Sequence, residues 1–254
     1  MLKIIAIGGG GIGDDGAKPE VLSISLEIIR LSGKRNPKFL FLPTAALDDE
    51  NYIKAVKNHF GRDLKCRLET LCLIKQKPEM AERKGKILAA DIIYVGGGNT
   101  LLMMNRWRKL GVDKLLLLAA KKGKVLCGPS AGAICWFRQG NSDSRKFRNP
   151  KAKLIKVTGL GFIDALACPH YDVEKDRKPE LKEMMKNTKG FAVAIDNCAA
   201  LEVAGNKYRI LASKPKAGVY SVFWRSGKFH EHKYEGTAKW FLLSKLLDSK
   251  KDDL

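Results

Sequence analysis

Residues 124–134 read Lys-Val-Leu-Cys-Gly-Pro-Ser-Ala-Gly-Ala-Ile. An apolar run typical of a buried strand leads into Gly-Pro-Ser-Ala-Gly, a G-x-S-x-G pattern, and then into an apolar helical start. Small residues around the serine allow a sharp strand-to-helix turn that holds its side chain out at the carboxyl end of a sheet. The stretch therefore predicts Ser130 as a nucleophile, with a glycine-lined turn and a helix-capping serine as the alternative.

Strand and helix patterns alternate before this stretch. Short apolar runs predict strands at 2–7, 38–42, 67–73, 91–95 and 124–127. Helical patterns lie between them, at 19–31, 49–60, 80–88, 100–110 and 112–121. Repeated strand–helix–strand units indicate a three-layer α/β fold, with a mostly parallel sheet covered by helices on both faces.

The regular alternation of strand and helix patterns ends after residue 133. A polar, basic loop is expected at 141–149, followed by strands at 154–157 and 165–168, a helix at 174–187 and short strands up to residue 229. These strands predict an antiparallel C-terminal extension of the sheet, and a last helix is expected at 237–247. No linker or internal repeat divides the chain, so residues 1–254 are expected to form a single domain.

A second glycine-rich turn follows the predicted strand at 91–95. Residues 91–100 read Asp-Ile-Ile-Tyr-Val-Gly-Gly-Gly-Asn-Thr, so backbone N–H groups can approach a ligand closely at the same edge of the sheet. Gly97 or Gly98, together with the amide of Ala131, is expected to donate to an oxyanion. Asn99 is expected to contact the substrate. No Gly-Lys-Ser or Gly-Lys-Thr follows, which argues against a phosphate-binding P-loop.

A serine nucleophile needs a general base, and the chain has four histidines. His170 follows a predicted strand in Ala-Cys-Pro-His-Tyr-Asp, which places it on a loop at a strand end, where catalytic residues of open α/β sheets gather. His59, His230 and His232 lie in helical or charged stretches and are expected on the surface. His170 is therefore the predicted base.

The acid that would orient the imidazole is left open by the sequence. Asp143, in Asn-Ser-Asp-Ser after the nucleophile turn, is the first choice, and Asp172 and Asp196 are the alternatives. Each of the three also suits a turn-forming aspartate. The predicted catalytic set is thus Ser130, His170 and Asp143.

A glycine-rich segment at residues 8–16, Gly-Gly-Gly-Gly-Ile-Gly-Asp-Asp-Gly, contains G-x-G-x-x-G after the first predicted strand. A dinucleotide site would also need an acidic residue after the second strand, where the chain reads Phe-Leu-Pro-Thr. The segment is instead expected to be a loop that borders the site. The sequence shows no clustered metal ligands, so neither a metal nor an organic cofactor is expected.

The chain is strongly basic, with 47 Lys and Arg against 27 Asp and Glu and a formal net charge of +20. Such an excess attracts acidic substrates and polyanions. The basic residues are spread along the chain without a dense block or a nucleic-acid-binding motif, so specific nucleic-acid binding is not expected. A polyanion-binding protein is kept as an alternative to an enzyme.

The six cysteines lie apart from one another without a C-x-x-C pair, which is typical of reduced thiols in a cytosol. The first residues do not resemble a signal peptide, and no apolar run approaches the roughly 18 residues of a membrane span. A cytoplasmic protein without membrane contact is expected, and the choice between monomer and homodimer is left open.

Three motifs, in this order and spacing, resemble the peptidase E family of serine peptidases, which includes aspartyl dipeptidases and, more distantly, cyanophycinases. They are Tyr-Val-Gly-Gly-Gly-Asn-Thr, Gly-Pro-Ser-Ala-Gly-Ala-Ile-Cys-Trp and Cys-Pro-His-Tyr-Asp, and the resemblance covers roughly residues 2–211. It implies a flavodoxin-like or class I glutamine amidotransferase-like fold and the hydrolysis of small peptides, such as dipeptides with an N-terminal aspartate. It also implies that Ser130 and His170 are nucleophile and base, and that Arg177 binds the acidic side chain of the substrate.

Two positions depart from the pattern of this family. After Cys-Trp-Phe, relatives usually have Glu and later His before Ser-Asp-Ser, where this chain has Arg138 and Asn141. If that glutamate orients the histidine in the family, its role here would fall to Asp143. Otherwise activity would be low, because loss of the orienting acid can reduce turnover about 10⁴-fold. The alternative is a pseudoenzyme that keeps the fold as a binding module.

Overall fold

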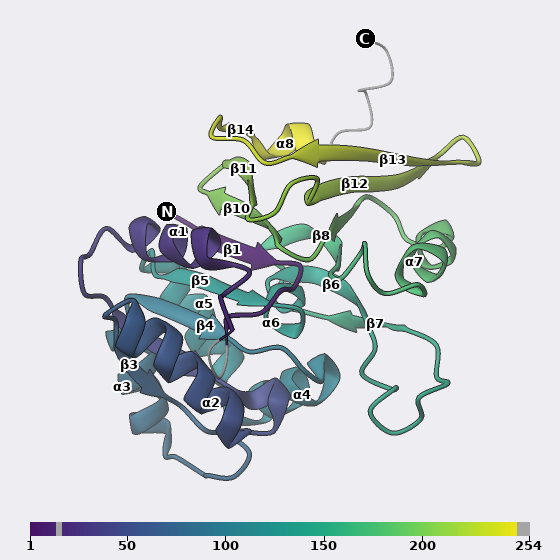
Figure 1. Ribbon diagram of the computed structural model, residues 1–254. Helices are drawn as coiled ribbons and strands as arrows, with labels where there is room; N and C mark the ends of the chain where they lie inside the picture. Colours follow the sequence, from purple (N-terminus) through teal and green to yellow (C-terminus); the bar gives the residue numbers. More distant parts are fainter. Residues whose placement is uncertain (14–16, 248–254) are drawn as a thin grey trace.

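Two β-sheets with helices packed around them make up the computed structural model, which describes residues 1–13 and 17–247 (Figure 1). The larger sheet contains, in spatial order, β14 (Phe241–Leu242), β11 (Lys207–Ala212), β10 (Ala199–Ala204), β1 (Lys3–Ile7), β5 (Val125–Pro129), β4 (Ile92–Val95), β2 (Lys38–Leu42) and β3 (Arg67–Thr70). The smaller sheet contains β13 (Lys228–Glu235), β12 (Gly218–Arg225), β9 (Ala192–Ile195), β8 (Ile163–Cys168), β6 (Phe137–Ser142) and β7 (Ile155–Thr158).

Strand directions confirm the predicted α/β class. In the larger sheet, the strands β1, β5, β4, β2 and β3 are parallel to one another. The later strands β10, β11 and β14 pair in antiparallel fashion and extend the sheet beyond β1. The second sheet was not predicted. Its centre is parallel, with β8 between β6 and β9, and its edges are antiparallel. Most strands after Ser130 therefore form a sheet of their own rather than an extension of the first.

Helices cover both faces of the larger sheet. They are α1 (Leu22–Ser32), α2 (Glu50–Val56) with its π-helical continuation (Lys57–Asp63), α3 (Met80–Ala89), α4 (Thr100–Leu110) and α5 (Val112–Lys121). Of the later helices, α6 (Ala131–Ile134) follows β5, α7 (Arg177–Lys186) packs on the smaller sheet and α8 (Leu243–Leu246) follows β14. Side chains alternate along β1, so Ile5 and Ile7 pack with α1 and α2, whereas Ile4 and Ala6 pack with α3, α4 and α5.

The core between the two sheets is continuous. The cluster around Ile4 also contains Ala167 of β8 and Val193 of β9, so the smaller sheet packs on the same apolar interior as the larger one. Among the described helices, none has the length and apolar character needed to cross a bilayer.

Two sequence predictions for the C-terminal half are wrong. The helix expected at 237–247 is replaced by β14 and the four-residue α8, because β11 offers an unpaired edge and Phe241 packs against Tyr208, with ring centroids 5.8 Å apart. The loop expected at 141–149 begins later, because Asn141 and Ser142 are buried at the end of β6.

A buried charge cluster joins α1 to the antiparallel strands. Glu202 of β10 is fully buried, and Nε of Arg209 donates to its Oε2 at 2.6 Å. Nη2 of Arg209 also lies 2.6 Å from Oε1 of Glu27 on α1. Burial raises the pKa of Glu202 to about 7, and the neighbouring Glu27 carboxylate adds to the increase.

We expect Glu202 to make the protein less stable as the pH rises from about 4.5 to about 7. The folded state holds a proton on Glu202 that the unfolded chain releases in this range, so the stabilisation is complete at low pH and is lost through the folded pKa. In urea unfolding at several pH values, the free energy of unfolding should fall less with rising pH for Glu202→Gln than for the wild type. The exposed Glu69→Gln serves as the matched control, and identical slopes in all three proteins would contradict this account.

Candidate active site

Ser130 lies between β5 and α6, at the turn that the G-x-S-x-G pattern predicts. Its φ angle is +56°, a conformation that non-glycine residues rarely adopt. A Cβ atom added at Gly128 or at Gly132 would overlap the carbonyl oxygen of Val95 at the end of β4. Both glycines are therefore needed for the turn to pack against β4, and they leave the side chain of Ser130 partly exposed.

The end of β1 brings Ser130 and His170 together. The backbone N–H of Ser130 donates to the carbonyl oxygen of Ile7 at 3.1 Å, and the backbone N–H of His170 donates to that of Gly8 at 3.2 Å. Because these carbonyls belong to consecutive residues, the two main chains are fixed next to each other. Within the described part of the chain, Oγ of Ser130 makes no hydrogen bond, so its hydroxyl is free to meet a base or a substrate.

His170 is oriented by a residue that the sequence analysis did not select. Its Nδ1 lies 2.8 Å from Oδ1 of Asn197, so the ring donates Nδ1–H to this amide and keeps Nε2 as the proton acceptor. A Cβ atom at Gly9 would overlap both side chains, so the glycine-rich segment after β1 does border the site. Gly9 thus provides the packing surface for the imidazole.

Two aspartates flank Asn197. Oδ1 of Asp172 accepts the backbone N–H of Asn197 at 2.8 Å. Asp196 is buried, and its Oδ2 accepts from the backbone N–H of Gly218 at 3.0 Å and from the hydroxyl of Tyr220 at 3.2 Å. Burial, followed by the charge of Asp172, raises the pKa of Asp196. A neutral amide at Asn197 avoids a third carboxylate beside these two.

Asp143, the predicted acid, and Arg177, the predicted substrate-binding arginine, lie next to each other and make no hydrogen bond or ion pair with His170 among the described residues. Nη2 of Arg177 lies 3.8 Å from Oδ2 of Asp143, and Nε of Arg177 lies 2.6 Å from Oε2 of Glu174. Nη1 of Arg177 donates to the carbonyl oxygen of Asn141 at 2.8 Å. Arg177 is only 1% exposed, so its guanidinium group is occupied within the protein.

Arg138, which replaces the family glutamate, also has its own partners. Its Nε lies 3.1 Å from Oδ1 of Asp164, and its Nη2 donates to the carbonyl oxygen of Lys189 at 3.0 Å. Both partners lie at the side of the smaller sheet, on β8 and just before β9. Neither Arg138 nor Asp143 therefore takes the position beside Nδ1 of His170.

Backbone N–H groups for an oxyanion are present next to Ser130. A Cβ atom at Gly97 would lie 3.5 Å from Cβ of Ser130, so this turn packs directly against the serine. The N–H of Gly97 points to the hydroxyl of Tyr52 at 3.4 Å, whereas those of Gly98 and Ala131 make no hydrogen bond to another described residue. Asn99 caps α4, with Oδ1 accepting from Leu102 at 3.0 Å.

Two other side chains that could act as a base or a nucleophile, those of His59 and Cys168, are buried. His59 was expected on the surface but is 3% exposed, and its Nε2 lies 2.9 Å from Oγ of the equally buried Ser25. Cys168 ends β8 close to His170 in sequence, but burial raises the pKa of its thiol to about 12. Neither group is therefore available to an external substrate at neutral pH.

A serine on a strand-to-helix turn of a parallel sheet, with a histidine held beside it, is the arrangement of α/β serine hydrolases. The family model of peptidase family S51 matches residues 4–211 of this chain. The chain therefore belongs to peptidase family S51 and is a serine-type peptidase, in agreement with the predicted resemblance to peptidase E.

Proteins with similar sequences are also named as peptidases. The uncharacterized peptidase YgaJ of Bacillus subtilis (strain 168) is 37% identical over 226 residues, which cover 87% of this chain and 92% of YgaJ. The uncharacterized peptidase Lmo0363 of Listeria monocytogenes serovar 1/2a is 31% identical over 144 residues, which cover 52% of this chain and 64% of that protein.

Solved structures share the fold. A peptidase from an acI-B1 actinobacterium superposes with a TM-score of 0.71 at 17% identity, over 95% of this chain and 97% of its own. A candidate peptidase E protein from Listeria monocytogenes EGD-e gives a TM-score of 0.63 at 21% identity, over 84% of this chain and 98% of its own. At these identities the likeness concerns the fold alone.

Asn197 was missed although the sequence carries a signal for it. It lies two residues beyond the end of β9, and His170 lies two residues beyond the end of β8. The two strands are parallel neighbours, so their carboxyl ends meet at one edge of the smaller sheet. Polar residues just after two adjacent parallel strands would have indicated the pair, once β8 and β9 were known to be neighbours.

We expect the neutral ring of His170 to carry its proton on Nδ1. Nitrogen-15 NMR of histidine-labelled protein at alkaline pH should show this tautomer, and Asn197→Ala should shift the population toward Nε2–H because the acceptor is gone. We also expect kcat of Asn197→Ala to fall about a hundredfold with little change in KM. Asn206→Ala, at an exposed turn, is the matched control, and an unchanged tautomer in Asn197→Ala would contradict the assigned hydrogen bond.

We expect Arg177→Ala to reduce the stability of the fold. The free energy of unfolding should fall by about 2 to 3 kcal/mol, less than for a fully buried pair because Glu174 and Asp143 are partly exposed. Lys175→Ala removes the same charge from an exposed position and should change it by less than about 0.5 kcal/mol. Unchanged stability of Arg177→Ala, together with a raised KM for acidic substrates, would instead favour substrate binding by this arginine.

Proposed function

We propose that this peptidase hydrolyses small peptides through an acyl-enzyme on Ser130, with dipeptides that begin with aspartate as the first substrates to test. The observation that carries the proposal is the attachment of Ser130 and His170 to consecutive carbonyl groups at the end of β1. The substrate class is supported by the resemblance to peptidase E. The N–H groups of Gly98 and Ala131, which make no hydrogen bond to another described residue, can stabilise the oxyanion of the reaction.

The reaction begins when Nε2 of His170 takes the proton of Oγ of Ser130 while the serine attacks the scissile carbonyl carbon. The oxyanion that forms accepts hydrogen bonds from Gly98 and Ala131. His170 then gives its proton to the leaving amine as the C–N bond breaks. Water, deprotonated by His170, attacks the acyl-enzyme, and the release of the carboxylic acid regenerates Ser130.

Asn197 takes the place of the usual acid in this scheme. Its amide oxygen fixes the ring orientation, but it carries no negative charge to stabilise the imidazolium that forms during the reaction. Turnover below that of a Ser-His-acid triad is therefore expected. Recognition of an acidic side chain falls to cations other than Arg177, whose donors are already occupied.

We expect wild-type protein to hydrolyse Asp-Leu faster than Glu-Leu or Ala-Leu. Ser130→Ala should lose at least about 10³-fold in turnover because the nucleophile is gone, whereas Ser23→Ala, at an exposed serine of the same chain, should retain it. A fluorophosphonate probe should label the wild type and not Ser130→Ala. Turnover that survives in Ser130→Ala would disprove the mechanism, and a wild type that is neither labelled nor active would favour the binding-module alternative.

A further inference from the structure

A groove of about 1080 Å³ lies between α4 and the segment that links β6 to β7. Figure 1 shows the course of these two parts of the backbone. It begins at Asn99, the next residue after Gly98, and follows α4 as far as Lys109. Nδ2 of Asn99 donates to the carbonyl oxygen of Ser144 at 3.2 Å, and Oγ of Ser144 accepts the N–H of Leu101 at 2.9 Å. These bonds join the two walls of the groove at Asn99, the end next to the candidate oxyanion turn.

The lining of this groove is positively charged and has no acidic member. Its five basic residues are Arg106, Lys109, Arg145, Arg148 and Lys153. None of them forms an ion pair with another described residue. Positive charges that share one concave surface repel each other, so an anion placed between them lowers the energy.

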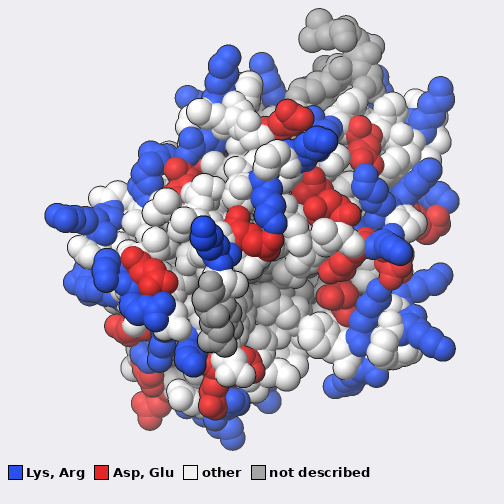
Figure 2. Space-filling view, viewed as in Figure 1, with Lys and Arg blue, Asp and Glu red and all other residues white. Residues whose placement is uncertain are grey.

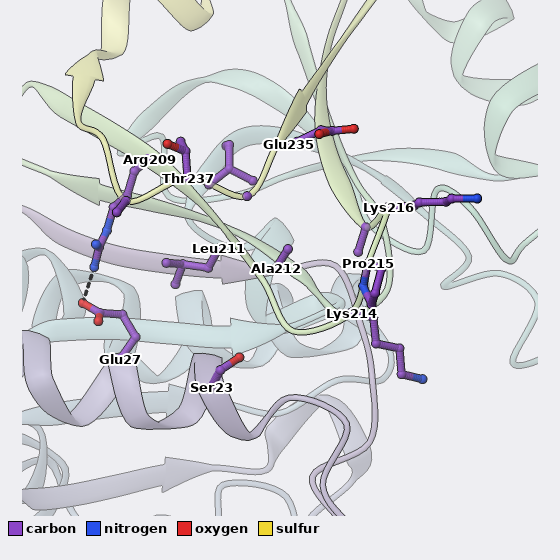
Figure 3. Close-up of a pocket in the computed structure, with 14 residues that line it drawn as sticks. Ser23, Glu27, Arg209, Leu211, Ala212, Lys214, Pro215, Lys216, Glu235 and Thr237 are labelled. Atoms are coloured by element: carbon purple, nitrogen blue, oxygen red, sulfur yellow. Dashed lines mark ion pairs between the residues drawn. The ribbon is translucent and has the colours of Figure 1, made fainter.

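Other concave regions hold acidic residues as well as basic ones. A pocket of about 510 Å³ between α1 and β11 contains Arg209 and Lys214 (Figure 3). Arg209 is paired with Glu27, and Lys214 is paired with Glu20. Figure 2 likewise shows both signs of charge side by side over the face in view. A net charge of +20 therefore does not by itself create an anion site, whereas an unpaired basic groove does.

We infer that this groove binds acidic residues of a peptide substrate, so that the peptidase accepts acidic peptides longer than a dipeptide. The inference rests on the proposed function, because it treats the groove as a continuation of the Ser130 site. From Asn99 to Lys109, α4 advances about 15 Å, which matches about four residues of an extended peptide. Leu101 and Leu102 add apolar contacts, and the lining holds no aromatic ring on which the bases of a single-stranded nucleic acid would stack.

The test measures binding separately from catalysis. Fluorescence anisotropy with Ser130→Ala protein compares a labelled hexapeptide rich in Asp and Glu with the same peptide carrying Asn and Gln. In that background, Arg145→Gln/Arg148→Gln removes two exposed groove charges, and Lys121→Gln/Lys122→Gln removes the same charge from the exposed end of α5. Thermal unfolding checks that each variant is folded, and Lys109→Gln/Lys153→Gln is the second groove variant.

We expect the acidic peptide to bind at least tenfold more tightly than its amide counterpart. Each groove variant should weaken it about tenfold, since two exposed ionic contacts are lost, while the α5 variant should stay within about twofold. Equal weakening by groove and α5 variants, or equal binding of the two peptides, would overturn the inference. Stronger competition by a single-stranded oligonucleotide than by the acidic peptide would overturn it in favour of nucleic acid.

Kinetics with intact Ser130 separate this inference from the proposed function. If the wild type cleaves acidic tetrapeptides, the groove variants should raise KM for them more than the α5 variant does. Cleavage of small peptides without any groove effect on acidic tetrapeptides would reject the groove and retain the function. Binding of acidic peptide in the groove without cleavage of any peptide would reject the function and retain the anion site.

Discussion

Two neighbouring carbonyl groups at the end of β1, those of Ile7 and Gly8, accept the backbone N–H groups of Ser130 and His170. Ser130 follows β5, the parallel neighbour of β1 in the larger sheet, whereas His170 follows β8 in the smaller sheet. The site therefore exists only where the two sheets meet. Both residues have positive φ angles, so these hydrogen bonds also offset backbone strain at the two positions.

The glycines around the site are needed because the backbone segments come very close to one another there. Gly128 and Gly132 lie against the carbonyl oxygen of Val95, and Gly9 lies against the ring of His170. At each position a methyl group would separate elements that have to touch. The glycine-rich appearance of the sequence around the site thus reflects close approach between strands and turns, and the nucleotide interpretation of residues 8–16 is not needed to explain it.

Features that depend on local sequence were predicted well. The first five strands and the helices between them follow from hydrophobic periodicity, and the positions of Ser130 and His170 at strand ends follow from the motifs around them. Features that depend on which segments become neighbours in the folded chain were not predicted. Asn197 requires the pairing of β8 with β9, and the error at 237–247 arose because an unpaired edge on β11 recruited residues with good helical spacing.

Arg177 illustrates a different limit. The resemblance to peptidase E implied that Arg177 binds the substrate, but here the chain folds Asp143, Glu174 and the carbonyl of Asn141 around it. Burial is a tertiary property, and no spacing within residues 170–180 indicates it. The basic residues of the groove, which form no ion pair with another described residue, lie instead on α4 and on the segment after β6, which the sequence marks only as polar and basic.

The amide at position 197 also has an evolutionary consequence. Asparagine and aspartate have nearly the same shape, and their codons differ by one nucleotide. A lineage with this backbone can therefore move between a neutral and a charged partner for His170 without rebuilding a single loop, provided that Asp172 and Asp196 tolerate the added charge. On the proposed mechanism, the catalytic rate of such a protein depends on this one side chain and its neighbours, so it can change while the fold stays the same.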